Sequence, residues 1–139
     1  TGWRGVMETA QGSSVPDRFR SIPGAVFPLY HVLADIGEFA GGEVLAGQPS
    51  DAPAVDGIVL RKGGRVRVLV ANMTAELQRV TVPGLRGRID LRLLDASAAE
   101  ESMRSPETFR NRLGTMREAA TGLDLDLLPF AVARLDGVG

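Results

Sequence analysis

The apolar positions near the start of the chain repeat every three to four residues, which predicts an amphipathic helix over residues 27–39. Pro28 suits the first helical position, and Gly41 with Gly42 provides the stop. We expect one buried stripe on this helix, formed by Leu29, Val32, Leu33, Ile36 and Ala40. The opposite face carries His31, Asp35 and Glu38 and is expected to be polar.

From Glu43 onward the period changes to two, which indicates strands with one apolar face. The strand-like segments are 44–47, 57–62, 65–72, 77–82, 88–94, 123–128 and 130–136. Short strands separated by turn residues predict a mainly β protein, an antiparallel Greek-key β-sandwich. Between residues 96 and 121 the rhythm is lost, and a short helix over 105–113 is expected, anchored by Phe109 and Leu113.

Gly63 and Gly64 lie between two strand-like segments and predict a hairpin. A plain two-residue turn would place Leu60 opposite Arg67 and Ile58 opposite Leu69. That register would mix core and solvent positions on one face. We therefore expect a glycine bulge that shifts Leu60 to face Val66 and Ile58 to face Val68.

The N-terminal residues suggest a piece of a different fold. Residues 1–24 are rich in glycine and polar residues, with a short strand expected at 3–7. We expect two parts: residues 1–42, a strand-loop-helix segment of a larger structure, and residues 43–139, the β-sandwich domain.

Charge and composition exclude several classes of function. The 16 Lys and Arg residues nearly balance 17 Asp and Glu residues, so neither nucleic acid nor an anionic membrane surface is an expected partner. The chain has no cysteine, which excludes disulfides, thiolate nucleophiles and Cys-ligated metals. No apolar run has the length of a membrane span. We expect no cofactor and no metal, and a cytoplasmic location.

His31 is the sole histidine and the first candidate for a base or metal ligand. Metal sites need several clustered ligands, so a hydrogen-bonded surface or interface histidine is the preferred interpretation. Asp124 and Asp126 alternate along one strand and are expected to form a solvated face rather than a calcium site. The charged residues of 100–112 are interpreted as a charged surface.

Four phrases carry a family resemblance: TGWRG, VFPLYHVLADIGEF, VLVANMT and LPFAVARLD. Together they resemble the C-terminal part of the D-apionate lactonase family, a bacterial sugar-acid catabolism group with a glycoside-hydrolase-like barrel and a C-terminal β domain. The resemblance implies that residues 1–42 are the last strand, loop and helix of a (β/α)8 barrel and that the rest is its sandwich.

The resemblance also implies that the intact parent hydrolyses a sugar-acid lactone or a glycoside. The reacting groups of such barrels lie at the ends of several strands, and one such end is expected here, so no catalytic residue is predicted. Three residues would lie nearest that rim and could contact substrate: Trp3 as a stacking wall, Arg4 as a clamp for a carboxylate or carbonyl, and Glu8 as a hydrogen-bonding partner.

The leading hypothesis is therefore a non-catalytic accessory region that braces the missing barrel domain of its own parent chain. An alternative is a stand-alone β-sandwich that binds carbohydrate or a protein partner, although after the helix the only aromatic residues are Phe109 and Phe130. A third is a small hydrolase that uses His31. If the stripe lacks its natural cover, self-association is expected through Leu29, Val32, Leu33 and Ile36.

Overall fold

The computed structural model describes residues 3–4, 7–8, 22–45 and 54–138. Contacts divide the chain into two compact units. One comprises Thr1–Glu38 with Ser97–Arg112, and the other comprises Phe39–Ala96 with Leu113–Gly139. The first is called the helical unit and the second the strand unit.

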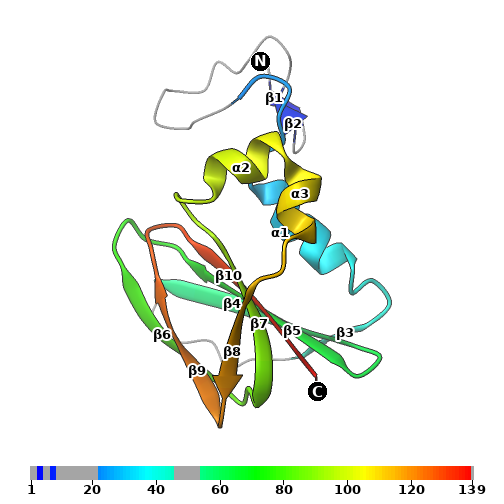
Figure 1. The fold of residues 1–139 in the computed structure, drawn as a ribbon, viewed down its shortest axis with the longest axis vertical. Coiled ribbons are helices and arrows are strands. Elements are labelled where there is room, and N and C mark those ends of the chain that lie inside the picture. The colour runs from blue at the N-terminus through cyan, green and yellow to red at the C-terminus, as the bar shows by residue number, and fades with distance from the viewer. Residues whose placement is uncertain (1–2, 5–6, 9–21, 46–53, 139) are drawn as a thin grey trace. The chain divides into compact units, whose positions relative to one another are not determined.

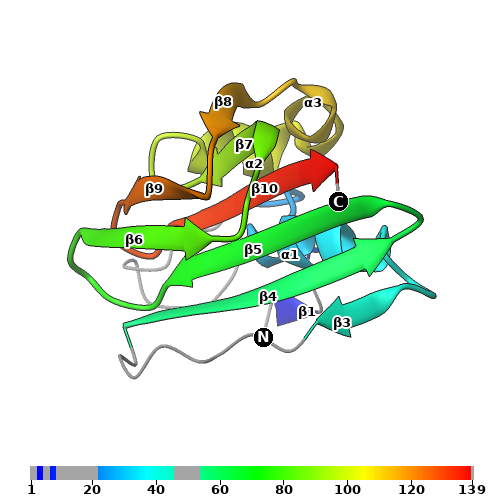
Figure 2. The same cartoon turned by 90° about the horizontal axis from the view of Figure 1, so that it is seen from below.

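Over its described residues, 39–45, 54–96 and 113–138, the strand unit contains two antiparallel sheets, so the mainly β prediction is confirmed (Figures 1 and 2). The six-stranded sheet has the order β3-β4-β5-β10-β7-β8, and the two-stranded sheet pairs β6 with β9. Figure 2 shows β4 and β5 as a long hairpin with β3 along its outer side. The strands are β3 (Glu43–Leu45), β4 (Val55–Lys62), β5 (Arg65–Asn72), β6 (Gln78–Pro83), β7 (Gly87–Leu94), β8 (Thr115–Ala119), β9 (Gly122–Leu127) and β10 (Val132–Val138).

Aliphatic side chains from both sheets form one core. Val82, Leu125 and Leu127 come from the two-stranded sheet, and β5, β7 and β10 supply the opposite side. Ala133 and Leu135 of β10 are fully buried at its centre. Because these residues alternate along each strand, the two-residue period in the sequence reports this face correctly.

The β4–β5 register differs from the expected one. Leu60 pairs with Arg67 and Ile58 with Leu69, as in a plain two-residue turn. Gly63 and Gly64 both have positive φ, 56° and 76°, which a two-residue hairpin turn of this kind requires. The predicted bulge is wrong because it assumed that Arg67 faces solvent.

Arg67 is instead 1% exposed, on the face of the sheet opposite the aliphatic core. Its Nε lies 2.6 Å from Asp136 Oδ1, and its Nη2 lies 3.1 Å from Oδ2, a two-point contact between paired strands. Arg134 Nε lies 3.0 Å from the same carboxylate. The ring of Phe39 lies 4.8 Å from the Arg67 guanidinium carbon, in cation–π range. Both faces of β5 are therefore buried.

Asn72 fixes one end of the sandwich. It is 2% exposed, and its Nδ2 donates to the backbone oxygens of Glu76, Leu127 and Leu128. Its Oδ1 accepts from the backbone N–H of Thr74 at 2.9 Å. One amide side chain thus joins the loop after β5 to the end of β9, which lies more than fifty residues further along the chain.

In the part of the helical unit that the structure describes, there are three helices and a small hairpin (Figure 1). The helices are α1 (Leu29–Gly37), α2 (Ala99–Arg104) and α3 (Pro106–Asn111), and the hairpin pairs β1 (Trp3–Arg4) with β2 (Met7–Glu8). The helix predicted at 27–39 is confirmed as α1. The single short strand expected at 3–7 is wrong, because this part of the chain forms two two-residue strands that pair antiparallel.

The orientation of α1 reverses the expectation. Leu29, Leu33 and Ile36 are 49%, 51% and 37% exposed, whereas His31 and Asp35 are buried. The prediction of a buried apolar stripe is wrong within this chain. The physical reason is that α2 and α3 provide hydrogen-bonding partners for the polar face, so burial of that face leaves few groups unsatisfied.

The region without strand rhythm contains α2, α3 and β8. Phe109 is buried as predicted, but Leu113 is 87% exposed and is no anchor. The strand β8 went unpredicted because most of its residues are exposed, so no apolar alternation marks it. No helix in the described ranges is long and apolar enough to cross a membrane.

The partly buried Asp136 carboxylate can be compared with an exposed one. We expect Asp136→Asn to lower the free energy of unfolding by about 3 kcal/mol, because two guanidinium groups lose their counter-charge in a buried setting. The matched variant is Asp126→Asn, whose partner Arg79 is 84% exposed and 3.5 Å away, and the expected loss there is below about 1 kcal/mol. Urea denaturation measures both, and equal losses would contradict the structural role of Asp136.

Candidate functional site

The three predicted substrate-contacting residues lie in the β1–β2 hairpin. The register places Trp3 opposite Glu8 and Arg4 opposite Met7. Backbone pairing thus places Trp3 beside Glu8, whereas Arg4 is the partner of Met7. Their roles as wall, clamp and hydrogen-bonding partner stay predictions.

His31 has a structural environment. Its Nε2 lies 2.8 Å from the backbone oxygen of Ser102, and because a carbonyl only accepts, Nε2 carries the proton. The ring meets Phe109 edge-to-face, with 4.7 Å between centroids. The prediction of a hydrogen-bonded histidine is confirmed, but the surface location is wrong, since only 2% of His31 is exposed.

Ser102 does not act as a nucleophile for His31. Its hydroxyl donates to the backbone oxygen of Ala99 at 2.8 Å, and the contact with His31 uses the Ser102 carbonyl. A nucleophile needs its own hydroxyl within hydrogen-bond reach of the base. The pair therefore closes a structural contact between α1 and α2.

Arg110 of α3 contacts three polar groups of the α1 segment. Its Nη2 lies 2.9 Å from Asp35 Oδ1 and also contacts the Glu38 carboxylate, while Nη1 donates to the His31 backbone oxygen at 3.2 Å. The Arg110 side chain is 14% exposed. The interpretation of 100–112 as a charged surface is wrong for Arg110, although Arg104 and its partner Glu100 are exposed. The spacing of His31, Asp35 and Glu38 predicts their shared helical face, but no local signal in the sequence indicates that Arg110 covers this face.

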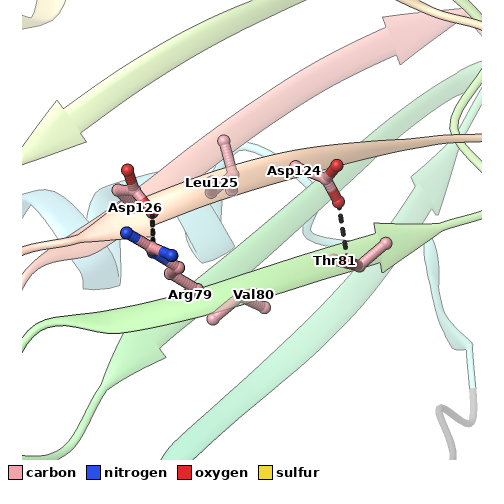
Figure 3. Close-up of a pocket in the computed structure, with 6 residues that line it drawn as sticks. All are labelled: Arg79, Val80, Thr81, Asp124, Leu125 and Asp126. Carbon is pink, nitrogen blue, oxygen red and sulfur yellow. Dashed lines mark hydrogen bonds and ion pairs between the residues drawn. The ribbon is translucent and has the colours of Figure 1, made fainter.

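A shallow hollow of about 360 Å³ lies along β6 and β9 (Figure 3). Across it, Thr81 Oγ1 donates to Asp124 Oδ1 at 2.7 Å, and Arg79 pairs with Asp126 at 3.5 Å. Each carboxylate thus interacts with the residue that faces it in the strand register. The solvated-face prediction for Asp124 and Asp126 is confirmed, because both are exposed.

Two further features bear on binding. Among the described residues, no three His, Cys, Asp or Glu side chains lie close enough to hold a metal ion.

Phe130 is 66% exposed and has a φ of 56°, a conformation that is rare for an aromatic residue. Phe109 is the other aromatic residue that follows Phe39 in the sequence, and it is buried. One exposed ring does not form the aromatic plane that a sugar-binding module uses.

Comparison with known proteins gives a consistent picture. Residues 52–135 match the family described as D-apionate lactonase, C-terminal immunoglobulin-like domain. A solved structure with a similar fold is a GH30 endoxylanase from Clostridium papyrosolvens C71, with a TM-score of 0.63 and 10% sequence identity. The similarity covers 82% of this chain but 28% of that enzyme, so the chain corresponds to little more than a quarter of the enzyme's length. A search of curated proteins finds no match.

The structural role of His31 has a direct test. We expect His31→Ala to lower the free energy of unfolding by about 2–4 kcal/mol, since it removes the hydrogen bond to Ser102 and the contact with Phe109. His31→Gln keeps an N–H donor and should recover part of this loss. Chemical denaturation measures the stability. A His31→Ala chain of unchanged stability that loses measurable lactone hydrolysis would instead support the small-hydrolase hypothesis.

Proposed function

Because this chain belongs to the D-apionate lactonase C-terminal immunoglobulin-like domain family, we propose that it is the non-catalytic accessory region of a glycoside-hydrolase-like parent. In this proposal the parent's catalytic barrel precedes the sandwich, and residues 1–42 supply its last strand, loop and helix. The parent hydrolyses a sugar-acid lactone, or a related glycoside, in bacterial carbohydrate catabolism in the cytoplasm.

The observation that carries the proposal is the outward apolar stripe of α1. Leu29, Leu33 and Ile36 are spaced so that they share one helical face, and each is more than a third exposed. The other face of α1 is already occupied by contacts with α2 and α3. A helix with one satisfied polar face and one bare apolar face needs a further apolar partner, and the parent barrel is the partner we propose.

The polar groups of the chain support a bracing role rather than a catalytic one. Arg110, Arg67 and Asn72 are each engaged with partners far away in sequence, and these contacts join elements of the fold. Such pairing stabilises a scaffold. In the proposal, Trp3, Arg4 and Glu8 contribute to the rim of the substrate site, whose remaining residues come from the barrel.

The stand-alone binding module is the second candidate, and exposed Phe130 is the observation that favours it. One aromatic ring could stack on a single sugar. Calorimetric titration of the chain with neutral sugars and aldonates separates the two proposals, since binding that Phe130→Ala abolishes would favour the module.

The stripe predicts how the isolated chain behaves. We expect the 139-residue chain to self-associate as its concentration rises, because the stripe lacks the barrel that would cover it. Leu33→Glu should keep the chain monomeric in light scattering, since a carboxylate at the centre of the stripe resists desolvation. Val44→Glu is the matched control, at a position that is 67% exposed on β3, and should associate as the unchanged chain does.

The same variant tests the barrel as partner. In the full parent polypeptide we expect Leu33→Glu to lower the melting temperature and the lactonase activity together, whereas Val44→Glu leaves both unchanged. A monomeric chain at all concentrations, combined with a parent that tolerates Leu33→Glu, would overturn the proposed interface.

A further inference from the structure

The segment between β7 and β8 does not belong to the sandwich that it interrupts. Ser97–Arg112 groups with Thr1–Glu38, whereas the strands on either side of the segment belong to the other unit. The chain thus leaves the strand unit after β7, forms the two short helices α2 and α3, and returns to the strand unit at β8. Residues 97–112 are called the excursion. The contacts of this excursion with the segment around α1 decide what the excursion does.

The first set of contacts completes the end of α2. The last carbonyl groups of a helix have no partner within the helix. In α2 two of these carbonyls accept hydrogen bonds from the other segment: Ser102 O from His31 Nε2 at 2.8 Å, and Met103 O from the backbone N–H of Val26 at 3.2 Å. A helix of six residues is too short to be stable alone, so α2 depends on these donors.

The second set completes the end of α1. Asp35 and Glu38 lie at the carboxyl end of that helix, where the helix dipole disfavours negative charge, and its last turn has no basic residue. Arg110 supplies the missing positive charge from α3 and also donates to the His31 backbone oxygen. Helix α1 therefore depends on the excursion as the excursion depends on α1.

We propose that residues 97–112 form a clasp whose partner is the polar face of helix α1, and that Arg110 is the residue that determines docking. The clasp recognises a helix end with two carboxylates on one face, together with the His31 backbone carbonyl of the same helix, which accepts a hydrogen bond from Arg110. It leaves the apolar stripe of α1 uncovered. This inference rests on the proposed function. It makes α1 a shared helix, which contacts the clasp of the accessory region on one face and the parent barrel on the other.

The two faces of α1 therefore have different roles in binding. The charged contacts need defined geometry and so select one helix in one orientation. The apolar stripe has no such directional demand. Loss of Arg110 should therefore release α1 from the clasp without altering the stripe.

Hydrogen exchange of the full 139-residue chain tests the clasp. We expect Arg110→Met, which keeps the aliphatic stem and removes the charge, to lower the amide protection of residues 29–38 by at least about tenfold. Asp35→Asn, which removes one carboxylate, should lower the same amides. The matched control is Arg104→Met, because Arg104 is exposed and pairs with Glu100 of its own helix. It should leave α1 protected.

The amides of β5 and β10 report whether each variant still folds, and they should keep their protection. If the amides of α1 are equally protected in Arg110→Met and Arg104→Met while the amides of these strands stay protected, the clasp proposal is wrong. If Arg110→Met unfolds the strands, Asp35→Asn decides: unchanged protection of α1 in that variant overturns the proposal. The proposed function fails separately, through Leu33→Glu, since that variant alters the stripe and not the clasp.

Discussion

The contact of Arg110 with Asp35 and Glu38 is the constraint on which the helical unit depends. Once a guanidinium from α3 holds the carboxylates of α1, the polar face of that helix must lie inward and its aliphatic face outward. Two acidic groups at a helix carboxyl end are unfavourable without such a partner. The exposed stripe is thus a consequence of where the charges are satisfied, not of a weak hydrophobic preference.

The strand unit follows the same rule at Arg67. Burial of an arginine is unfavourable unless a carboxylate and further contacts accompany it, and Arg67 has Asp136 beside it on the neighbouring strand and the Phe39 ring within 5 Å. The pairing of β5 with β10 brings these groups together. A one-residue shift of β5 would move Arg67 to the aliphatic core face, so the ion pair and the register of β5 support each other.

The sequence predicts the positions of the strands better than it predicts which face of each strand or helix is buried. Strands β6, β7 and β9 carry regular apolar alternation, and β4, β5 and β10 contain apolar runs near turn residues, so the positions of these strands follow from the sequence. The inward faces of α1 and β5 cannot be predicted in this way, because their polar groups are paired with residues far away in the sequence. Asp136 is 69 residues from Arg67, and Arg110 is 72 residues from Glu38. Local pattern cannot report such pairs, so it assigns buried charges to solvent. The candidate residues Trp3, Arg4 and Glu8 could be grouped from the sequence because they lie within one short hairpin.

The two faces of α1 also differ in what they can contribute to an assembly. Leu29, Leu33 and Ile36 retain roughly half of their surface, so covering them would add about 2–4 kcal/mol in total. That gain is non-directional and would accept many apolar surfaces. The carboxylates on the other face add little net stability when paired, but they reject a wrong partner strongly, because an unmatched charge would be left desolvated. In the proposed assembly, the accessory region would take its affinity for the barrel from the stripe and its orientation from the clasp, and a domain that must hold a neighbour in one position needs both.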